Sequence, residues 1–194
     1  MSNQVETIIS VQLENRDKKT VFWRGFLAFP VTIFLTSFVQ GMHWGWSTGL
    51  VVVPTVLALV VRGVYPSYVL TFNHSLMELQ TRVIAYTLLL TDDYPSIERN
   101  PNVAVLLPDV GGGKKLNRGL PLIKWFLAIP LVIVGLIYSL VALFATFFAW
   151  IITWSSGTYP KWALDIVLGT IKFWNRVYGY AIILVTDEYP SFAL

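Results

Sequence analysis

Cysteine is absent from the chain of 194 residues, which excludes disulfides and thiolate metal sites. Charged residues are scarce too: they make up 13% of the chain, against about 25% in an average soluble domain. The two histidines, His43 and His74, lie far apart and form no ligand-spaced motif. The sequence shows no serine–histidine–aspartate set and no phosphate loop ending in Gly-Lys-Ser/Thr. We therefore expect no catalytic residues, no metal and no cofactor.

Apolar side chains are abundant instead, with hydrophobic residues at 55% of the chain and aromatic residues at 15%. This composition is typical of an integral membrane protein. The net charge of +3 is then better explained by membrane topology than by a nucleic-acid surface, and no nucleic-acid partner is expected. The first twenty or so residues mix charged and polar side chains, which argues against a cleavable signal peptide.

Two apolar runs in the first half predict transmembrane helices at about 21–39 and 44–61, since about 20 apolar residues cross the hydrocarbon core. Arg24 is the single charge of the first run, and we expect it to reach the interface by snorkelling. The segment at about 67–86 mixes apolar and charged residues, which favours an amphipathic helix in the interface.

The second half repeats this order, with apolar runs at about 120–134 and 136–154 and a mixed segment at about 161–180. A single helix from Trp125 to Trp154 would measure about 45 Å at 1.5 Å per residue. That length exceeds the hydrocarbon core of about 30 Å. We therefore expect a hairpin that turns at Gly135.

Four short motifs occur twice and in the same order. The clearest pair is Thr91-Asp92-Asp93-Tyr94-Pro95 and Thr186-Asp187-Glu188-Tyr189-Pro190, which we call the acidic pentapeptides. The others are FLAFP with FLAIP, GVYP with GTYP, and RV with RV. These matches predict two tandem repeats, residues 1–99 and 116–194, joined by a linker at 100–115.

The distribution of charge predicts the topology. If each repeat crosses the membrane twice, all fourteen Lys and Arg residues fall on one side, as expected for cytoplasmic loops. The sequence thus predicts an all-α integral membrane protein of two parallel repeats, each a transmembrane helical hairpin followed by an amphipathic interfacial helix. We expect a multi-pass protein of the inner (plasma) membrane with both termini cytoplasmic. Short cytoplasmic strands are compatible with the alternation at 9–13 and the apolar run at 103–107.

Several of these segments resemble the DUF4389 family of membrane proteins. The resemblance is carried by RGLPLIKWFLAIP at 118–130, GTYP at 157–160, WNRV at 174–177 and TDEYPSF at 186–192. The second repeat matches closely, whereas the first departs at Arg24 and at Gln80-Thr81. The resemblance implies a membrane module. It implies no reaction and no catalytic residues, because the family is one of unknown function.

The candidate contacts to a partner or to lipid fall into three groups. The acidic pentapeptides form a cation or partner site, or act only as turns; calcium would need about six to eight oxygens. The arginines upstream pair with those carboxylates, bind a lipid phosphate or snorkel. The basic cluster attracts anionic lipid at about 1 kcal/mol per residue or only sets topology. The candidates are Asp92, Asp93, Tyr94, Asp187, Glu188 and Tyr189; Arg82 and Arg176; Lys114, Lys115 and Arg118.

The sequence therefore favours a non-enzymatic membrane accessory or scaffold protein. Its expected partners are membrane lipids and a partner membrane protein or a second copy of the chain. Two alternatives stay open: a small transporter or channel with a site between the repeats, and an enzyme that acts on lipid substrates.

Overall fold

A computed structural model describes residues 3–26, 51–96, 98 and 101–194 of the chain. These residues are mostly helical, with one small sheet. In chain order the elements are β1 (Glu6–Ile9), α1 (Lys18–Phe26), α3 (Val53–Leu57), the π-helix η2 (Ala58–Arg62), α4 (Ser67–Thr87), β2 (Val103–Leu106), two short 3-10 turns (Gly111–Gly113 and Leu120–Leu122), α5 (Lys124–Ser156) and α6 (Lys161–Ala181).

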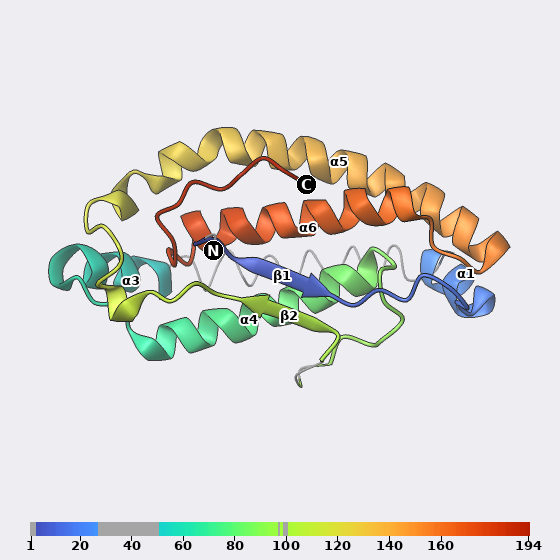
Figure 1. Ribbon diagram of the computed structural model, residues 1–194, viewed down its shortest axis with the longest axis horizontal. Helices are drawn as coiled ribbons and strands as arrows, with labels where there is room; N and C mark the ends of the chain where they lie inside the picture. The colour runs from blue at the N-terminus through green and yellow to red at the C-terminus, as the bar shows by residue number, and fades with distance from the viewer. Residues whose placement is uncertain (1–2, 27–50, 97, 99–100) are drawn as a thin grey trace.

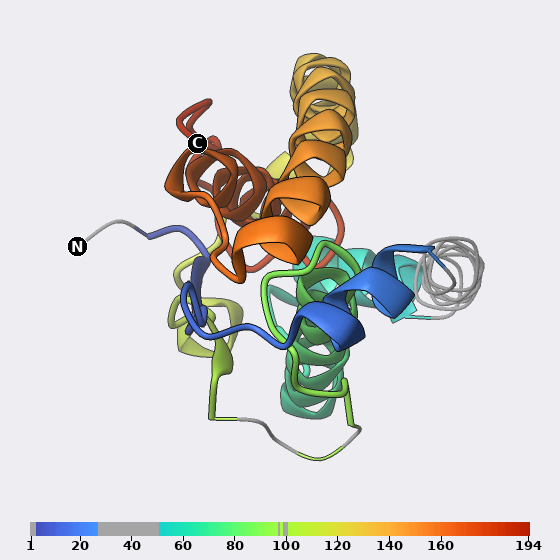
Figure 2. The same cartoon turned by 90° about the vertical axis from the view of Figure 1, so that its right-hand side faces the viewer.

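The longest helix, α5, runs along one edge of the molecule, and α6 packs beneath it (Figure 1). A short connection at 157–160 makes α6 antiparallel to α5. The two strands and α4 lie on the other side of α6 (Figure 1). The view along the long axis shows α5 next to α6 and farther from the strands (Figure 2). The last turns of α5 contact α1, and Ala142, Ala145 and Ala149 of α5 share a buried cluster with Ala85 of α4. The core thus follows the long axis, with α6 at its centre.

The sheet confirms that short strands are present and changes their extent. β1 pairs antiparallel with β2, from Glu6 opposite Leu106 to Ile9 opposite Val103. The expected first strand lay at about 9–13, so β1 begins and ends earlier than the alternation predicted. The two strands are bonded to each other, and they pack on α6 and α4.

The hairpin expected at about 120–134 and 136–154 is wrong, because α5 continues through Gly135 without a break. A Cβ at Gly135 would lie 2.7 Å from Cζ2 of Trp174 and 3.0 Å from Cε1 of Phe173, both on α6. Pro130 also lies inside α5, where it removes one backbone donor. Gly135 therefore allows α6 to approach closely and does not form a turn.

The structure confirms a helix at each of the two segments expected to be amphipathic, while their position in the membrane interface stays a prediction. The segments expected at about 67–86 and 161–180 form α4 and α6. Glycines in the left-handed conformation end the helices before them, with φ of 63° at Gly63 and 79° at Gly157. The Tyr-Pro steps that follow prevent helix continuation. The left-handed glycine and the following proline together explain why these two helices end at Arg62 and Ser156, close to the ends of the apolar runs in the sequence.

Among the described residues, α5 is the one helix long and apolar enough to cross a membrane, by length and composition alone. Most of the expected span at 21–39, the turn at 40–43 and the start of the span at 44–61 lie outside the described residues. Of the first span the structure describes α1, and of the second it describes the residues from 51 onward, through α3 and η2.

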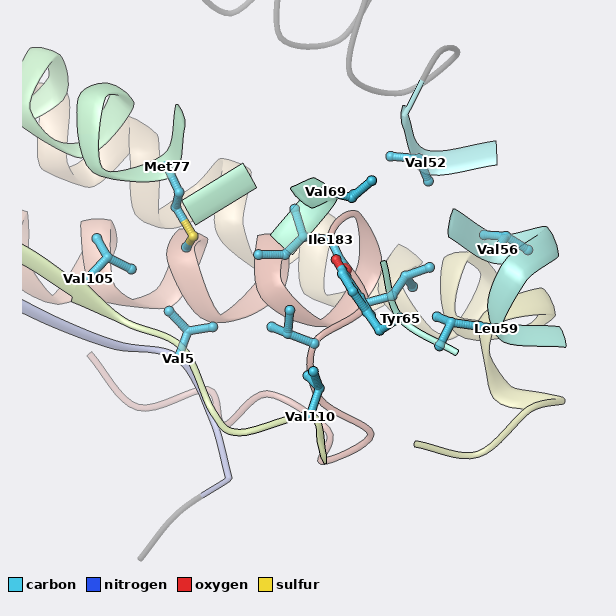
Figure 3. Close-up of a cluster of buried hydrophobic side chains, with 12 residues drawn as sticks. Val5, Val52, Val56, Leu59, Tyr65, Val69, Met77, Val105, Val110 and Ile183 are labelled. Atoms are coloured by element: carbon cyan, nitrogen blue, oxygen red, sulfur yellow. The ribbon is translucent and has the colours of Figure 1, made fainter. Parts of the chain in front are cut away.

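Buried apolar side chains from both halves of the chain share one cluster (Figure 3). Val5, Tyr65, Met77 and Val105 pack there with Ile183, which follows α6. The close-up shows the ring of Tyr65 lying against Ile183. The two halves are therefore joined through a common interior.

We expect Gly135→Val to destabilise the fold, because the added side chain has no room beside Trp174. Overpacking costs about 1–3 kcal/mol, so thermal unfolding in mild detergent should occur several degrees lower. Leu140→Val is the matched control, since it places the same β-branched residue on an exposed position of α5. Equal melting temperatures for the two variants would contradict the close approach of α6.

Candidate functional site

The first acidic pentapeptide is centred on Asp92, which two arginines clamp. Nη2 of Arg16 donates to Oδ1 of Asp92 at 2.6 Å, and Nη1 of Arg24 donates to the same oxygen. The side chain of Arg16 is fully buried and that of Arg24 is 8% exposed. Arg24 also lies over the ring of Tyr86, 3.9 Å from its centroid. We call Arg24, Tyr86 and Asp92 the first clamp.

The second pentapeptide repeats this arrangement around Asp187. Nζ of Lys124 lies 2.7 Å from Oδ1 of Asp187 and donates to the carbonyl of Thr186 at 2.6 Å. Lys124 is 1% exposed and lies 5.1 Å from the centroid of the Tyr180 ring. Lys124, Tyr180 and Asp187 form the second clamp. Each clamp joins a helix early in its half, α1 or α5, to the segment that follows the amphipathic helix of the same half.

Finer details recur around both clamps. The hydroxyl of Thr91 accepts a bond from the backbone N–H of Asp93, and that of Thr186 accepts one from Glu188, each at 3.1 Å. Leucines just before the pentapeptides, Leu89 and Leu184, both have φ of 60°, a conformation uncommon for residues other than glycine. The turn in each pentapeptide is therefore held by a threonine hydroxyl.

Arg24 corrects one expectation. It was expected to snorkel to the interface, but it is buried against Asp92 and Tyr86. A buried charge needs a partner, because desolvation costs several kcal/mol per ion. The first clamp supplies that partner.

Arg82 and Arg176 reach main-chain carbonyls of the segments that follow the pentapeptides. Nη1 of Arg82 donates to the carbonyl of Glu98, and Nη2 of Arg176 donates to that of Ala193. Arg82 is buried, and burial lowers the pKa of Arg176. Both arginines thus hold the chain in place after each pentapeptide, while the clamps occupy Asp92 and Asp187.

The remaining pentapeptide side chains also make internal contacts. Asp93 accepts a bond from Nδ2 of Asn102 at 2.7 Å. Glu188 accepts bonds from the first described residues, the backbone N–H of Asn3 and Nε2 of Gln4, each at 2.9 Å. The hydroxyl of Tyr189 donates to the carbonyl of Leu127 at 3.2 Å.

Tyr94 is the exception among the pentapeptide side chains, since it is 78% exposed. It meets the edge of Tyr86, whose ring lies in the first clamp. Within the described part of the chain, no three His, Asp or Glu side chains are arranged to hold a metal ion. Most side chains of the pentapeptides therefore make contacts within the chain.

The two tyrosines that precede prolines after η2 and α5, Tyr65 and Tyr159, are buried. The hydroxyl of Tyr65 donates to the carbonyl of Ile183 at 2.5 Å, and that of Tyr159 donates to the carbonyl of Leu88 at 3.5 Å. Each tyrosine thus reaches the segment before the pentapeptide of the other half. Burial raises the pKa of Tyr65 to about 12 and also raises the pKa of Tyr159.

The basic cluster is exposed, in contrast to the clamps. Lys114, Lys115 and Arg118 are all open to solvent just before α5. Nζ of Lys115 lies 2.5 Å from Oδ2 of Asp109, and this hydrogen bond lowers the pKa of Asp109. An exposed pair of this kind contributes little to stability. These cations remain accessible to an anionic ligand.

A second group of exposed cations lies near the other end of α5. It consists of Lys18, Lys19 and Lys161. Nζ of Lys18 donates to the carbonyl of Ser155, in the last turn of α5, at 2.6 Å. We call the two groups together the basic ends of α5. The sequence contained both groups, but only the fold assigns them to opposite ends of one helix.

Comparison with known proteins found no matching family model, no matching curated protein and no matching solved structure. The resemblance to DUF4389 therefore stays a prediction.

We expect Asp187→Asn to destabilise the protein, because it leaves Lys124 buried without a counter-charge. Removing one partner of a buried pair costs about 3–5 kcal/mol, and the partial exposure of Asp187 puts the loss at the lower end. Asp165→Asn, at an exposed position of α6, is the control. Adding Lys124→Met should restore part of the lost melting temperature, and a double variant no more stable than Asp187→Asn would contradict the clamp.

Alkaline pH should destabilise the protein through Tyr65. Its pKa is raised to about 12, against about 10 in the unfolded chain, so the folded state holds the proton more tightly. This stability is fully present below about pH 10 and is lost as the pH rises through about 12. Denaturant titration of Tyr65→Phe should show a smaller alkaline loss, and Tyr68→Phe, at an exposed tyrosine, should keep the full one. Identical pH profiles would contradict the assignment.

Proposed function

We propose that this chain is a non-enzymatic, membrane-bound scaffold whose exposed cations bind anionic lipid on the cytoplasmic side. The observation that carries the proposal is the outer face of α5, which is exposed and apolar along its whole length. Its members are Phe126, Ile129, Ile133, Leu136, Ile137, Leu140, Phe144, Phe148 and Ile151. Soluble monomers rarely expose continuous apolar patches of this kind, so this face needs a covering.

Lipid is the covering that suits the charges around that face. No Asp, Glu, Lys or Arg follows Lys124 within α5, and Lys124 itself is buried. Exposed cations then gather at both ends of the helix. An apolar surface flanked by Lys and Arg matches acyl chains bounded by anionic headgroups.

The ionisable groups that lie closest together favour a structural role. Asp92 and Asp187 face cations of the same chain, and Arg82 and Arg176 face its carbonyls. A general acid or base would need to meet a substrate. The two alternatives, a transporter or channel and an enzyme on lipid substrates, gain no support from these contacts.

We propose further that the chain consists of two tandem parallel repeats of one membrane module. Support comes from the two clamps, the paired leucines of positive φ and the two arginines that hold carbonyls. Tyr65 and Tyr159 each donate a hydrogen bond to a carbonyl in the other half of the chain, as expected for two repeats that pack against each other. The proposal includes an inner-membrane location, with both termini cytoplasmic, and recruitment of a partner membrane protein or a second copy.

Flotation with lipid vesicles tests the lipid-binding role. Protein released from mild detergent should partition more strongly into phosphatidylglycerol-containing vesicles than into pure phosphatidylcholine. Replacing Lys114, Lys115 and Arg118 by Gln should weaken that partition roughly a hundredfold, at about 1 kcal/mol per residue. High salt should weaken it as well.

The single variant Lys172→Gln, at a half-buried position of α6, controls for the loss of charge as such and should weaken partition no more than about fivefold. Equal partition into both kinds of vesicle, unchanged in the triple variant, would contradict the lipid role. Co-purification after mild detergent extraction tests the partner role, and a chain that always emerges alone counts against it.

A further inference from the structure

We infer that α5 lies in the plane of the membrane, with its outer face sunk into a single leaflet, and does not cross the bilayer. This inference rests on the proposed membrane function. It concerns how the helix meets the lipid, which length and composition alone leave undecided. Three observations on the described residues carry it.

The first observation is the length of the lipid-facing stripe. The outer face of α5 is exposed from Phe126 to Ile151, with Ile133 and Leu140 between them on the same side of the helix. The first and last of these residues are about 38 Å apart at 1.5 Å per residue. The hydrocarbon core is about 30 Å thick. A helix that crossed upright would place part of this apolar stripe beyond the hydrocarbon core, in the headgroup region.

The second observation is the polarity of the elements that run beside α5. Figure 1 shows α6, the sheet and α4 extending along the same axis. Nε1 of Trp174 on α6 donates to Oγ of Ser139 at 2.8 Å, near the middle of α5. Lys172 and Arg176 stand two residues either side of that tryptophan. If α5 crossed the bilayer, these charges would lie near its centre, at about 2.5–3.5 kcal/mol each.

An in-plane helix avoids that cost. α5 runs along one edge of the molecule with α6 beside it, the strands and α4 lie farther away, and α1 packs against the last turns of α5 (Figures 1 and 2). When the outer face of α5 enters the acyl region, the charged elements stay on the side of water. The depth at which amphipathic helices bind, about 5–10 Å into the headgroup and acyl boundary, suits a single embedded layer.

The third observation is the basic ends of α5. Lys114, Lys115 and Arg118 lie before the helix, while Lys18, Lys19 and Lys161 lie near its last turn. A spanning helix would carry one of these groups to the external side, against the bias of Lys and Arg toward the cytoplasm. An in-plane helix brings both groups to the same layer of anionic headgroups.

The absence of cysteine makes a direct test simple, since each introduced cysteine is the only one in the chain. Leu122→Cys and Thr158→Cys mark exposed positions just before and just after α5. Each variant is reconstituted separately in sealed vesicles of phosphatidylcholine and phosphatidylglycerol. The vesicles are then treated from outside with a membrane-impermeant maleimide. The in-plane helix predicts that both cysteines lie on the same side of the membrane. For a given orientation of the protein in the vesicle, the two variants should therefore be labelled to the same extent. Labelling of the two from opposite sides would overturn the inference and leave the membrane scaffold standing.

Depth measurements give a second readout that does not depend on topology. Phe126→Cys, Leu140→Cys and Ile151→Cys, all on the outer face of α5 and each carrying a fluorophore, are compared by quenching with lipids brominated at different depths. An in-plane helix gives similar, shallow depths at all three positions, whereas a spanning helix makes position 140 markedly deeper than the two ends. If the aqueous maleimide instead labels Leu140→Cys freely in vesicles, the outer face of α5 does not contact lipid. In that case the proposed function fails together with the inference.

Discussion

The buried cations of the two clamps constrain the rest of the structure. A cation in the protein interior is tolerated only beside a counter-charge, because removing its water costs several kcal/mol. Lys124 at the start of α5 and Arg24 in α1 each meet the carboxylate of an acidic pentapeptide. The chain after each amphipathic helix must therefore return to the helix that began its half. The need to bring Asp187 to Lys124 explains why the chain leaves α6 shortly before the second pentapeptide.

Buried side-chain hydrogen bonds connect the two halves of the chain between the clamps. Nδ2 of Asn175 on α6 donates to Oγ1 of Thr7 at 2.8 Å and to Oγ1 of Thr81 at 3.0 Å. Tyr65 and Tyr159 add their exchanged bonds to carbonyls. Buried polar groups that are satisfied in this way specify one arrangement. The halves are consequently parts of one folded body, and polar groups lie inside while the outer face of α5 is apolar.

Local patterns in the sequence predicted the amphipathic helices and their stops, but not the course of α5. The mixing of charge with apolar residues identifies α4 and α6, and Gly-Xaa-Tyr-Pro marks where the preceding helices end. The hairpin at Gly135 failed because it assumed that the apolar run must cross the membrane. The role of Gly135 depends on Trp174, a distant residue in the chain. Likewise, the partner of Arg24 is Asp92, which spacing alone does not reveal. The repeat in the sequence drew attention to the acidic pentapeptides, but only the fold shows which cations they meet within the chain.

The two faces of α5 explain how one helix can serve both folding and membrane binding. The face toward α6 carries small residues, including Ala128, Gly135, Ala142, Ala145 and Ala149, which let helices approach closely. Leu131 and Tyr138 also pack there, but most large side chains of α5 point away from α6. Packing on α6 therefore leaves the outer face uncovered, and each large aliphatic or aromatic side chain that lipid then covers contributes about 1.5–3 kcal/mol. If the basic ends hold both ends of α5 at one headgroup layer, as we propose, that gain is obtained by a helix lying along the leaflet and not by one that stands across it.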